Sequence, residues 1–200
     1  MPPSANLITT VFTPANWTGV LQPVDLFPSP GPIELDVGCG KGHFLVARAK
    51  EYPSTNFIGI DRMFKRIQLA DRKFLREKLM NVRLLRAEAF YTVCHLLPPL
   101  SVSMVHISFP DPWPKRRHHR RRLFSPDFLI ALHRVLLPGG QLNLATDDLP
   151  YYDAISALFS RDTRFKPLPP FNPREEERTA FERLFMRQGK PIHRCSFGKA

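Results

Sequence analysis

Short β-rich segments alternate with segments of helical periodicity from residue 33 onward, and this alternation limits the folds open to the chain. "IELDV" at 33–37 precedes a helical pattern over 43–52, and "TNFIGID" at 55–61 precedes an amphipathic basic stretch over 64–79. Further strands are predicted at 82–87, 101–109 and 141–146, each followed by a helical pattern. Strands and helices in this order form parallel βαβ units. We therefore expect an α/β fold with a doubly wound, mostly parallel, Rossmann-like sheet.

The two ends of the chain differ from this regular part. Residues 1–32 contain seven prolines and no Lys or Arg, so we expect an extended, poorly packed lead-in. After Thr163 the pattern is irregular and rich in proline, with a short helix near 176–187 and a last strand near 191–197. Two hundred residues is the length of one domain, which we place at 33–200.

The net charge of +11 and the pI of about 10.1 favour a polyanionic partner, either a nucleic acid or, less often, an anionic membrane. No stretch approaches the roughly 18 apolar residues of a membrane span, and "MPPSANLITTVF" lacks the basic start of a secretory signal. Cys39, Cys94 and Cys195 are odd in number and widely spaced, which indicates neither a disulfide framework nor a metal site. Reduced thiols are typical of the cytoplasm.

The positive charge is concentrated in two segments. Nine Lys and Arg residues lie between Arg62 and Arg86, against two acids, Asp71 and Glu77. Six more lie in the run Lys115–Arg122, which contains no acid and directly follows "FPDPWP". Such runs usually form solvated surface loops, but two basic segments together favour a surface that binds phosphates without reading sequence.

A glycine or an acidic residue follows each predicted strand. In a doubly wound sheet, ligands bind outside the carboxyl ends of the strands. We therefore expect these residues to lie along one edge of the sheet; they are Gly38, Asp61, Glu88, Asp111 and Asp147.

The first strand end favours one cofactor class over another. The loop Gly38-x-Gly40-x-Gly42 lets backbone approach a ligand closely, but His43 stands where a dinucleotide fingerprint requires glycine. Asp36 would repel a pyrophosphate and suits a cationic ligand. Asp61 is placed for ribose hydroxyls and Glu88 for an adenine edge. These features point to S-adenosylmethionine; the alternative is that the acids merely cap helices.

Five motifs together resemble the bacterial tRNA (guanine-N7)-methyltransferases, which modify guanine at position 46 in the variable loop. These motifs are "DVGCGKGHFL", "FIGID", "FPDPWPKRRHHRRR", "ATDDLPYY" and "TAFERLFMRQGKPIHR". The resemblance implies a class I methyltransferase fold, with Asp111 as the catalytic acid. The cofactor contacts that it implies are Asp36, Asp61, Glu88 and Asp111. The substrate contacts that it implies are Lys115, Asp147 and the segment Thr179, Ala180, Phe181 and Glu182.

The chemistry at guanine N7 suits the block around Asp111. N7 has a free lone pair and no proton to lose, so no strong base is needed, while the ring becomes cationic as the methyl group arrives. A fixed carboxylate stabilises that charge and holds the guanine edge. Pro110 and Pro112 restrict the backbone of Asp111, and Trp113 either stacks on a base or packs in the loop. We expect Arg120, Arg121 and Arg122 to grip the neighbouring phosphates.

Two other functions are consistent with parts of this pattern. One is a non-catalytic RNA-binding domain with a retained methyltransferase fold, which the complete set of strand-end acids argues against. The other is an NAD-dependent oxidoreductase, which His43 and the lack of a Tyr-x-x-x-Lys pair argue against. The sequence does not distinguish a monomer from a homodimer.

Overall fold

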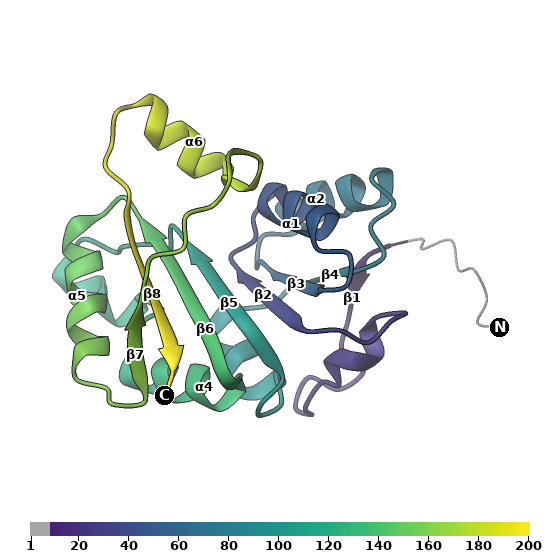
Figure 1. The fold of residues 1–200 in the computed structure, drawn as a ribbon, viewed down its shortest axis with the longest axis horizontal. Helices are drawn as coiled ribbons and strands as arrows, with labels where there is room; N and C mark the ends of the chain where they lie inside the picture. Colours follow the sequence, from purple (N-terminus) through teal and green to yellow (C-terminus); the bar gives the residue numbers. More distant parts are fainter. Residues whose placement is uncertain (1–8) are drawn as a thin grey trace.

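The structure, a computed structural model that describes residues 9–200, confirms the α/β fold with an eight-stranded sheet (Figure 1). The strands are β1 Val11–Phe12, β2 Ile33–Val37, β3 Asn56–Ile60, β4 Val82–Leu85, β5 Val102–Ser108, β6 Leu136–Thr146, β7 Phe165–Leu168 and β8 His193–Lys199. The helices are α1 His43–Glu51, α2 Phe64–Arg76, α3 Ala89–Tyr91, α4 Pro126–Val135, α5 Leu149–Ser160 and α6 Ala180–Arg187. Three 3₁₀ helices and one π-helix complete the order in the described residues. The 3₁₀ helices are η1 Pro23–Leu26, η3 Arg116–Arg121 and η4 Glu175–Glu177, and the π-helix is η2 Thr92–Leu96.

The sheet has the order β1-β4-β3-β2-β5-β6-β8-β7. Strands β1 to β6 pair in parallel, whereas β8 pairs antiparallel with both β6 and β7. The chain moves from β2 outward through β3 and β4, then returns to the other side of β2 with β5. Such a reversal opens a crevice at the carboxyl ends of the two strands beside it, here β2 and β5.

Alternating side chains of the parallel strands pack against helices on both faces of the sheet. In β3, Ile58 and Ile60 contribute to a large apolar cluster with α4 and α5, whereas Phe57 faces a second cluster with α1 and α2. Burial on both faces is typical of parallel sheets between helices. The predicted start of α4 is confirmed, because the Ser125 hydroxyl accepts a hydrogen bond of 3.2 Å from Phe128 N and Pro126 is the first helical residue.

The described part of the lead-in packs more closely than predicted. Thr10 is buried, and its N–H and hydroxyl both donate to Asp71 at 2.7 Å. The next two residues form β1, which pairs with β4, and Leu21 N donates to Leu96 O at 2.8 Å. Prolines at the ends of short segments permit such edge pairing, so proline content alone did not indicate poor packing. The boundary at residue 33 stays a prediction, and residues 1–8 lie outside the described part.

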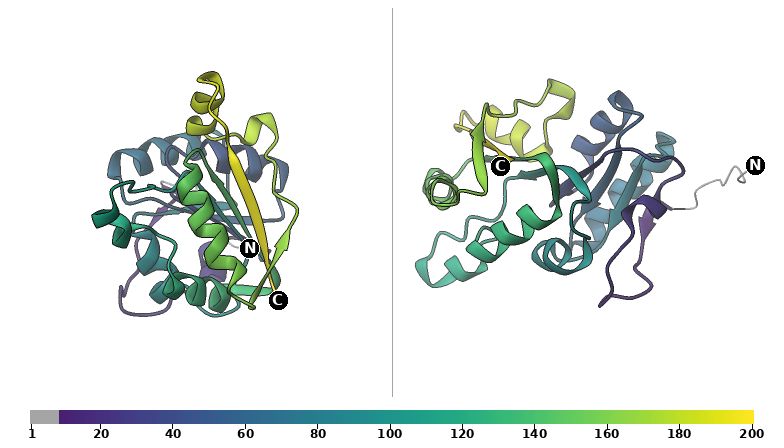
Figure 2. Two further views of the ribbon diagram at one scale, coloured as in Figure 1. Left: turned by 90° about the vertical axis from the view of Figure 1, so that its left-hand side faces the viewer. Right: turned by 60° about the horizontal axis from the view of Figure 1, so that its bottom comes forward.

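The C-terminal segment was predicted as a helix and a strand, and both are present. It also contains β7, an edge strand that includes Pro167 and was not predicted. Figure 2 shows β7 and β8 side by side, with α5 along them. Within residues 9–200, no helix is both long enough and apolar enough to span a bilayer.

Candidate functional site

The residues predicted at strand ends do lie after successive parallel strands of one sheet. Gly38 follows β2, Asp61 follows β3 and Asp147 follows β6 directly, while Glu88 lies beyond β4 and Asp111 beyond β5. Since β2 to β6 run in parallel, these positions share the carboxyl edge of the sheet, beneath α6 in Figure 1. The placement of this group is therefore confirmed, while the binding role of each residue stays a prediction.

The glycine loop divides into an open part and a packed part. Gly38 and Gly40 have φ of +81° and +56°, a region that favours glycine, and a Cβ on Gly38 would meet nothing within 4 Å. A Cβ on Gly42 would instead lie 2.7 Å from the Phe74 ring, so Gly42 permits close packing of the loop on α2. The open part, at Gly38 and Gly40, is where a ligand can approach the backbone.

Two buried carboxylates stand beside this loop. Asp61 Oδ2 accepts from Gly40 N at 3.1 Å and lies 3.5 Å from Arg66 Nη1, while its Oδ1 accepts from Met63 N at 2.8 Å. Asp36 is also buried; burial, and then the charge of Asp61, raise its pKa to about 7. A cation placed between or beside the two carboxylates stabilises their ionised forms.

Glu88 caps a helix in this structure. Its two carboxylate oxygens accept from Phe90 N at 3.0 Å and Tyr91 N at 2.6 Å, which fixes the start of α3. The capping alternative therefore applies to Glu88, whose side chain is exposed. Each oxygen keeps a second lone pair, so a contact with an adenine edge stays a prediction.

The loop that carries Asp111 is held in an unusual backbone conformation. Phe109 and Trp113 have φ of +54° and +45°, which costs a non-glycine residue on the order of 1–3 kcal/mol each. Phe109 N donates to Ala145 O at 2.7 Å, and Arg122 Nε donates to Pro112 O at 2.8 Å. These bonds fix both sides of Asp111 and leave its carboxylate exposed.

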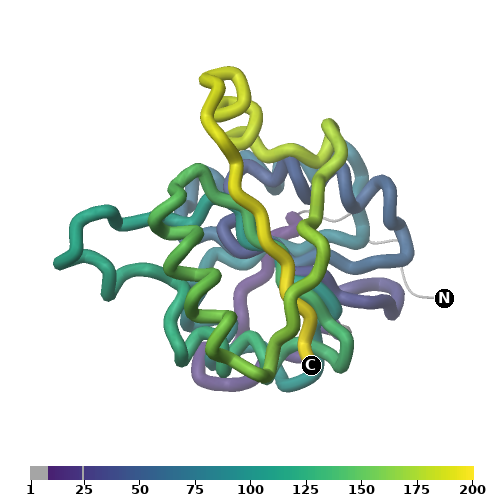
Figure 3. Tube along the Cα trace, turned by 60° about the vertical axis from the view of Figure 1, so that its left-hand side comes forward, coloured from purple at the N-terminus to yellow at the C-terminus, as the bar shows by residue number. Residues whose placement is uncertain are grey.

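The basic run forms η3 and separates into two kinds of residue. Arg122 is partly buried, and its guanidinium lies 4.7 Å from the centre of the Tyr151 ring. Arg121 lies 5.0 Å from the centre of the Trp113 ring, which also meets His118 edge to face. Trp113 therefore packs within the run. Lys115 and Arg120 are exposed, as are Arg116 and Arg117, and the segment projects from the molecule in Figure 3.

The remaining predicted substrate residues have structural partners. Asp147 Oδ2 lies 3.3 Å from Lys190 Nζ. The Thr179 hydroxyl caps α6 by accepting from Glu182 N at 3.1 Å. Glu182 is buried and forms ion pairs with Arg194 and Arg178.

Ala180 and Phe181 extend the same segment in the direction of solvent. Of the four residues Thr179 to Glu182, Glu182 is the buried one, and with Thr179 it lines a cavity beside His106, so their contact with the substrate stays a prediction.

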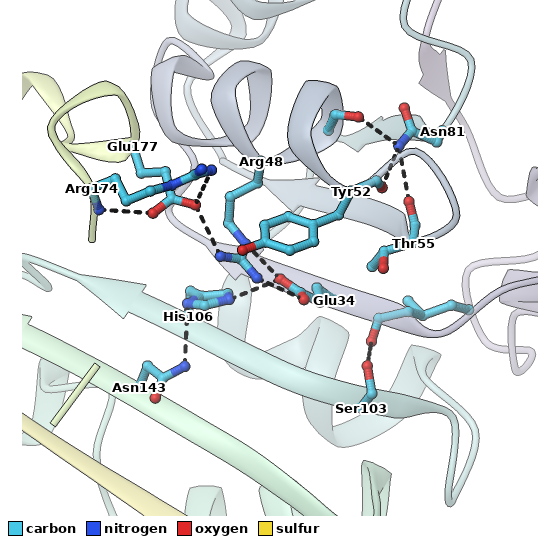
Figure 4. Close-up of polar contacts among 12 residues, drawn as sticks. Glu34, Arg48, Tyr52, Thr55, Asn81, Ser103, His106, Asn143, Arg174 and Glu177 are labelled. Atoms are coloured by element: carbon cyan, nitrogen blue, oxygen red, sulfur yellow. Dashed lines mark hydrogen bonds and ion pairs between the residues drawn. The ribbon is translucent and has the colours of Figure 1, made fainter. Parts of the chain in front are cut away.

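A buried polar network below the crevice was not predicted from the sequence (Figure 4). Arg48 on α1 bonds both oxygens of Glu34 at 2.8 and 2.9 Å and reaches Glu177 Oε1 at 3.1 Å. His106 Nε2 lies 3.1 Å from Glu34, and burial lowers its pKa, so we treat the ring as a neutral donor. Charged residues inside buried strands, Glu34 in β2 and His106 in β5, were the available signal.

Comparison with known proteins agrees with this architecture. Residues 30–195 match a family model described as "Putative methyltransferase". Among solved structures, the 16S rRNA methyltransferase KamB superposes with a TM-score of 0.63 at 19% identity, covering 84% of this chain and 88% of that one. TrmN from Thermus thermophilus has a TM-score of 0.61 at 23% identity, over 86% of this chain and 45% of that one. These two likenesses concern the fold.

Similarity in sequence extends over most of the chain. The tRNA (guanine-N(7)-)-methyltransferase of Rubrobacter xylanophilus is 36% identical over 180 residues, which are 87% of this chain and 79% of that protein. The protein of the same name from Halorhodospira halophila is 37% identical over 184 residues, 88% of this chain and 78% of its own length. The chain belongs to the tRNA (guanine-N7)-methyltransferase family.

Proposed function

We propose that this protein transfers a methyl group from S-adenosylmethionine to N7 of guanine in tRNA, at position 46 of the variable loop. Family membership supports the reaction. The observation that carries the proposal is the physical connection between the acidic and the basic parts of one segment. Arg122, the last residue of the cationic run, donates to Pro112 O at 2.8 Å and so fixes the loop that presents Asp111.

The loop and the acids beside it fit this cofactor. When bound, S-adenosylmethionine supplies an electrophilic methyl group on a positively charged sulfur. Gly38 and Gly40 leave space over the backbone, and the buried pair Asp36 and Asp61 favours a cationic ligand. Asp61 would accept from the ribose hydroxyls, in exchange for part of its contact with Arg66 at 3.5 Å. Glu88 would reach the adenine edge.

Asp111 supplies the electrostatic part of catalysis. Its exposed carboxylate stands at the carboxyl edge of the sheet on a loop fixed from both sides. There it accepts hydrogen bonds from the guanine edge and stabilises the positive charge that develops on the imidazole part of the base. A preorganised group of this kind needs no reorganisation during the reaction. No proton is removed from N7, so Asp111 does not act as a base.

The cationic run and the C-terminal segment hold the RNA. Lys115 and Arg120 are exposed in the run that follows Asp111 and bind phosphates on either side of the target base. Arg121 and Arg122 belong to the same surface, and Arg122 also fixes the loop. Asp147 contacts the substrate near Lys190, and the segment 179–182 frames the base from α6. Glu182 acts there indirectly, by orienting Arg194 and Arg178.

One experiment separates this function from its two alternatives. The protein is incubated with unmodified tRNA and labelled S-adenosylmethionine, and the tRNA is then digested to nucleosides. Labelled N7-methylguanosine is expected. A protein that binds tRNA but yields no labelled nucleoside would be the non-catalytic RNA-binding domain, and binding of NADH in place of the cofactor would indicate the oxidoreductase.

The cell compartment and the oligomeric state of the protein are also proposed. A tRNA substrate and three free thiols, Cys39, Cys94 and Cys195, support a cytoplasmic enzyme. Either a monomer or a homodimer is consistent with a site built from one chain.

A further inference from the structure

A second group of basic residues lies on the other face of the sheet from the run 115–122. Lys73 on α2 donates from Nζ to Lys41 O at 2.9 Å and lies 2.9 Å from His43 Nε2. Lys41 belongs to the glycine loop and His43 opens α1. Arg183 on α6 acts electrostatically on the same His43 ring. We call Lys41, His43, Lys73 and Arg183 the loop cluster.

The loop cluster contains no acid that balances its charge. Among residues 9–200, none of its members forms an ion pair. The two acids of the adjoining helix and its C-terminal turn are occupied elsewhere: Asp71 accepts from Thr9 and Thr10, and Glu77 pairs with Lys50 and Arg76. Glu175 and Glu176 approach Arg183 through their backbone carbonyls, which accept from Arg183 Nη2 at 3.1 and 3.3 Å. Four basic residues, from the glycine loop and from three helices, thus lie near one another without an ion pair in the described part of the chain, a placement that raises the free energy of the fold unless an anion binds there.

The titration behaviour agrees with this geometry. Burial, and then the charges of Lys73, Arg183 and Lys41, lower the pKa of His43. Burial, and then Lys41 and Arg76, lower the pKa of Lys73. His43 is therefore a neutral ring that accepts from the Lys73 ammonium. This bond and the one to Lys41 O orient the ammonium and leave its third N–H for a ligand.

The position of the cluster indicates what it binds. Lys41 lies next to Gly40 and Gly42, in the loop proposed to hold the cofactor. Arg183 lies one turn after Thr179 on α6, in the segment proposed to frame the base. The run 115–122 lies across the crevice, since η3 leads to α4 on the opposite face, and Figure 3 shows α1 and η3 on opposite sides of the molecule.

We propose that the loop cluster binds a backbone phosphate of the RNA substrate, so that the strand carrying the target base is held on both sides of the crevice. Lys41 and Arg183 are exposed and contact the phosphate directly, while Lys73, oriented by His43, completes the site from beneath. This inference rests on the proposed function, because it assumes an RNA substrate at the crevice. It adds a phosphate subsite that lies outside the basic run 115–122.

The test is the salt dependence of tRNA binding. Each lost phosphate contact lowers the slope of log affinity against log salt by about 0.7–0.9. Affinity for an unmodified tRNA transcript is measured over a range of salt for the wild type, for Lys41→Gln with Arg183→Gln, and for Lys41→Arg. The double variant should lose one phosphate contact and therefore about 0.7–0.9 from the slope, and Lys41→Arg should keep the wild-type slope. Lys166→Gln, on the edge strand β7 away from the carboxyl edge, is the matched control and should change nothing.

Two further readouts keep the outcomes separate. Calorimetry with S-adenosylmethionine alone should give the same affinity, within twofold, for the wild type and the double variant. If the double variant loses cofactor affinity but keeps the wild-type salt slope, the cluster binds the cofactor carboxylate. If both the slope and the cofactor affinity are unchanged, the cluster binds no ligand. Either result overturns the inference. Failure of the wild type to form N7-methylguanosine, with a reduced slope in the double variant, would contradict the proposed function and leave the phosphate site standing.

Discussion

Arg48 on α1 and Glu177 in the C-terminal segment form a buried ion pair, with 3.1 Å between Nη1 and Oε1. The pair joins the helix after the glycine loop to the turn η4, two residues before Thr179. Arg48 also holds Glu34, so one guanidinium pairs with two buried carboxylates, and Arg174 supplies Glu177 with a second cation at 3.4 Å. The segment that frames the crevice is thereby fixed to the half of the sheet that carries the cofactor loop.

Arg48→Met should be strongly destabilising. The change leaves Glu34 buried without its cation and Glu177 with Arg174 alone, and removal of one partner from a buried pair costs about 3–5 kcal/mol. Urea unfolding measures the loss. Arg174→Met is the matched control, because Arg174 also contacts Glu177 but is largely exposed, and it should cost much less. Similar losses of unfolding free energy in both variants would show that the buried Arg48–Glu177 pair contributes no more to stability than the exposed Arg174 contact.

The pKa of Asp36, raised to about 7, predicts two opposite effects of pH. Folding stability should fall as pH rises from near 4 to about 7, because the unfolded chain loses this proton first and the folded one retains it. Cofactor affinity should rise over the upper part of that range, because only the ionised carboxylate attracts the cationic cofactor. The quantity to measure is the difference between the wild type and Asp36→Asn at each pH, by unfolding and by calorimetry. A difference that does not depend on pH would contradict the shifted pKa.

Asp61→Ala should weaken cofactor binding by roughly 1.5–3 kcal/mol, because the ribose hydroxyls lose a charged acceptor. The Gly40 N–H loses its partner as well, which adds a distortion of the glycine loop. Calorimetry with S-adenosylmethionine provides the measurement, and Asp153→Ala, at an exposed position on α5, is the control. Unchanged affinity in a folded Asp61 variant would remove this residue from the site.

Arg120 and Arg122 should respond differently to substitution, although both belong to the basic run. Arg120→Glu alters an exposed charge and should weaken tRNA binding without affecting turnover at saturating tRNA. Arg122→Met removes the bond to Pro112 O and the contact with Tyr151, so it should lower turnover by releasing the Asp111 loop. Single-turnover rates over a range of tRNA concentrations separate the two effects. If both variants change tRNA affinity and turnover by equal amounts, the basic run acts only as a charged surface.

The fold and the strand-end acids were predictable because both depend on local sequence. Hydrophobic runs repeat with the βαβ period, and the topology then places Asp61 and Asp111 at one edge. The Arg48–Glu177 pair and the loop cluster were not predictable, because their members are separated by up to 142 positions, from Lys41 to Arg183, and meet only through packing of the C-terminal segment on α1. Strands β1 and β7 were missed for a related reason, since pairing with a neighbour outweighs a weak local preference.

Asp111→Asn is the most direct test of the proposed chemistry. The substitution keeps the shape of the side chain and some hydrogen bonding but removes the charge that would stabilise the methylated ring. The loop should keep its conformation, because the bonds that fix it involve Phe109 N and Pro112 O and not the carboxylate. Binding of tRNA should persist through the basic run, while turnover should fall by about 10²–10³, the effect of one preorganised electrostatic contact in other enzymes.

The pH profile distinguishes this role from proton abstraction. N7 carries no proton, so the wild-type rate should show no loss on the acidic side of neutrality that belongs to a catalytic base. The phenol of Tyr151 does not provide one either, since burial raises its pKa and outweighs the lowering effects of the Phe124 backbone and the charge of Arg122. Single-turnover rates of the wild type and Asp111→Asn are compared at saturating tRNA and cofactor across neutral pH. Equal rates would mean that the carboxylate is structural and that catalysis in this enzyme consists of positioning alone.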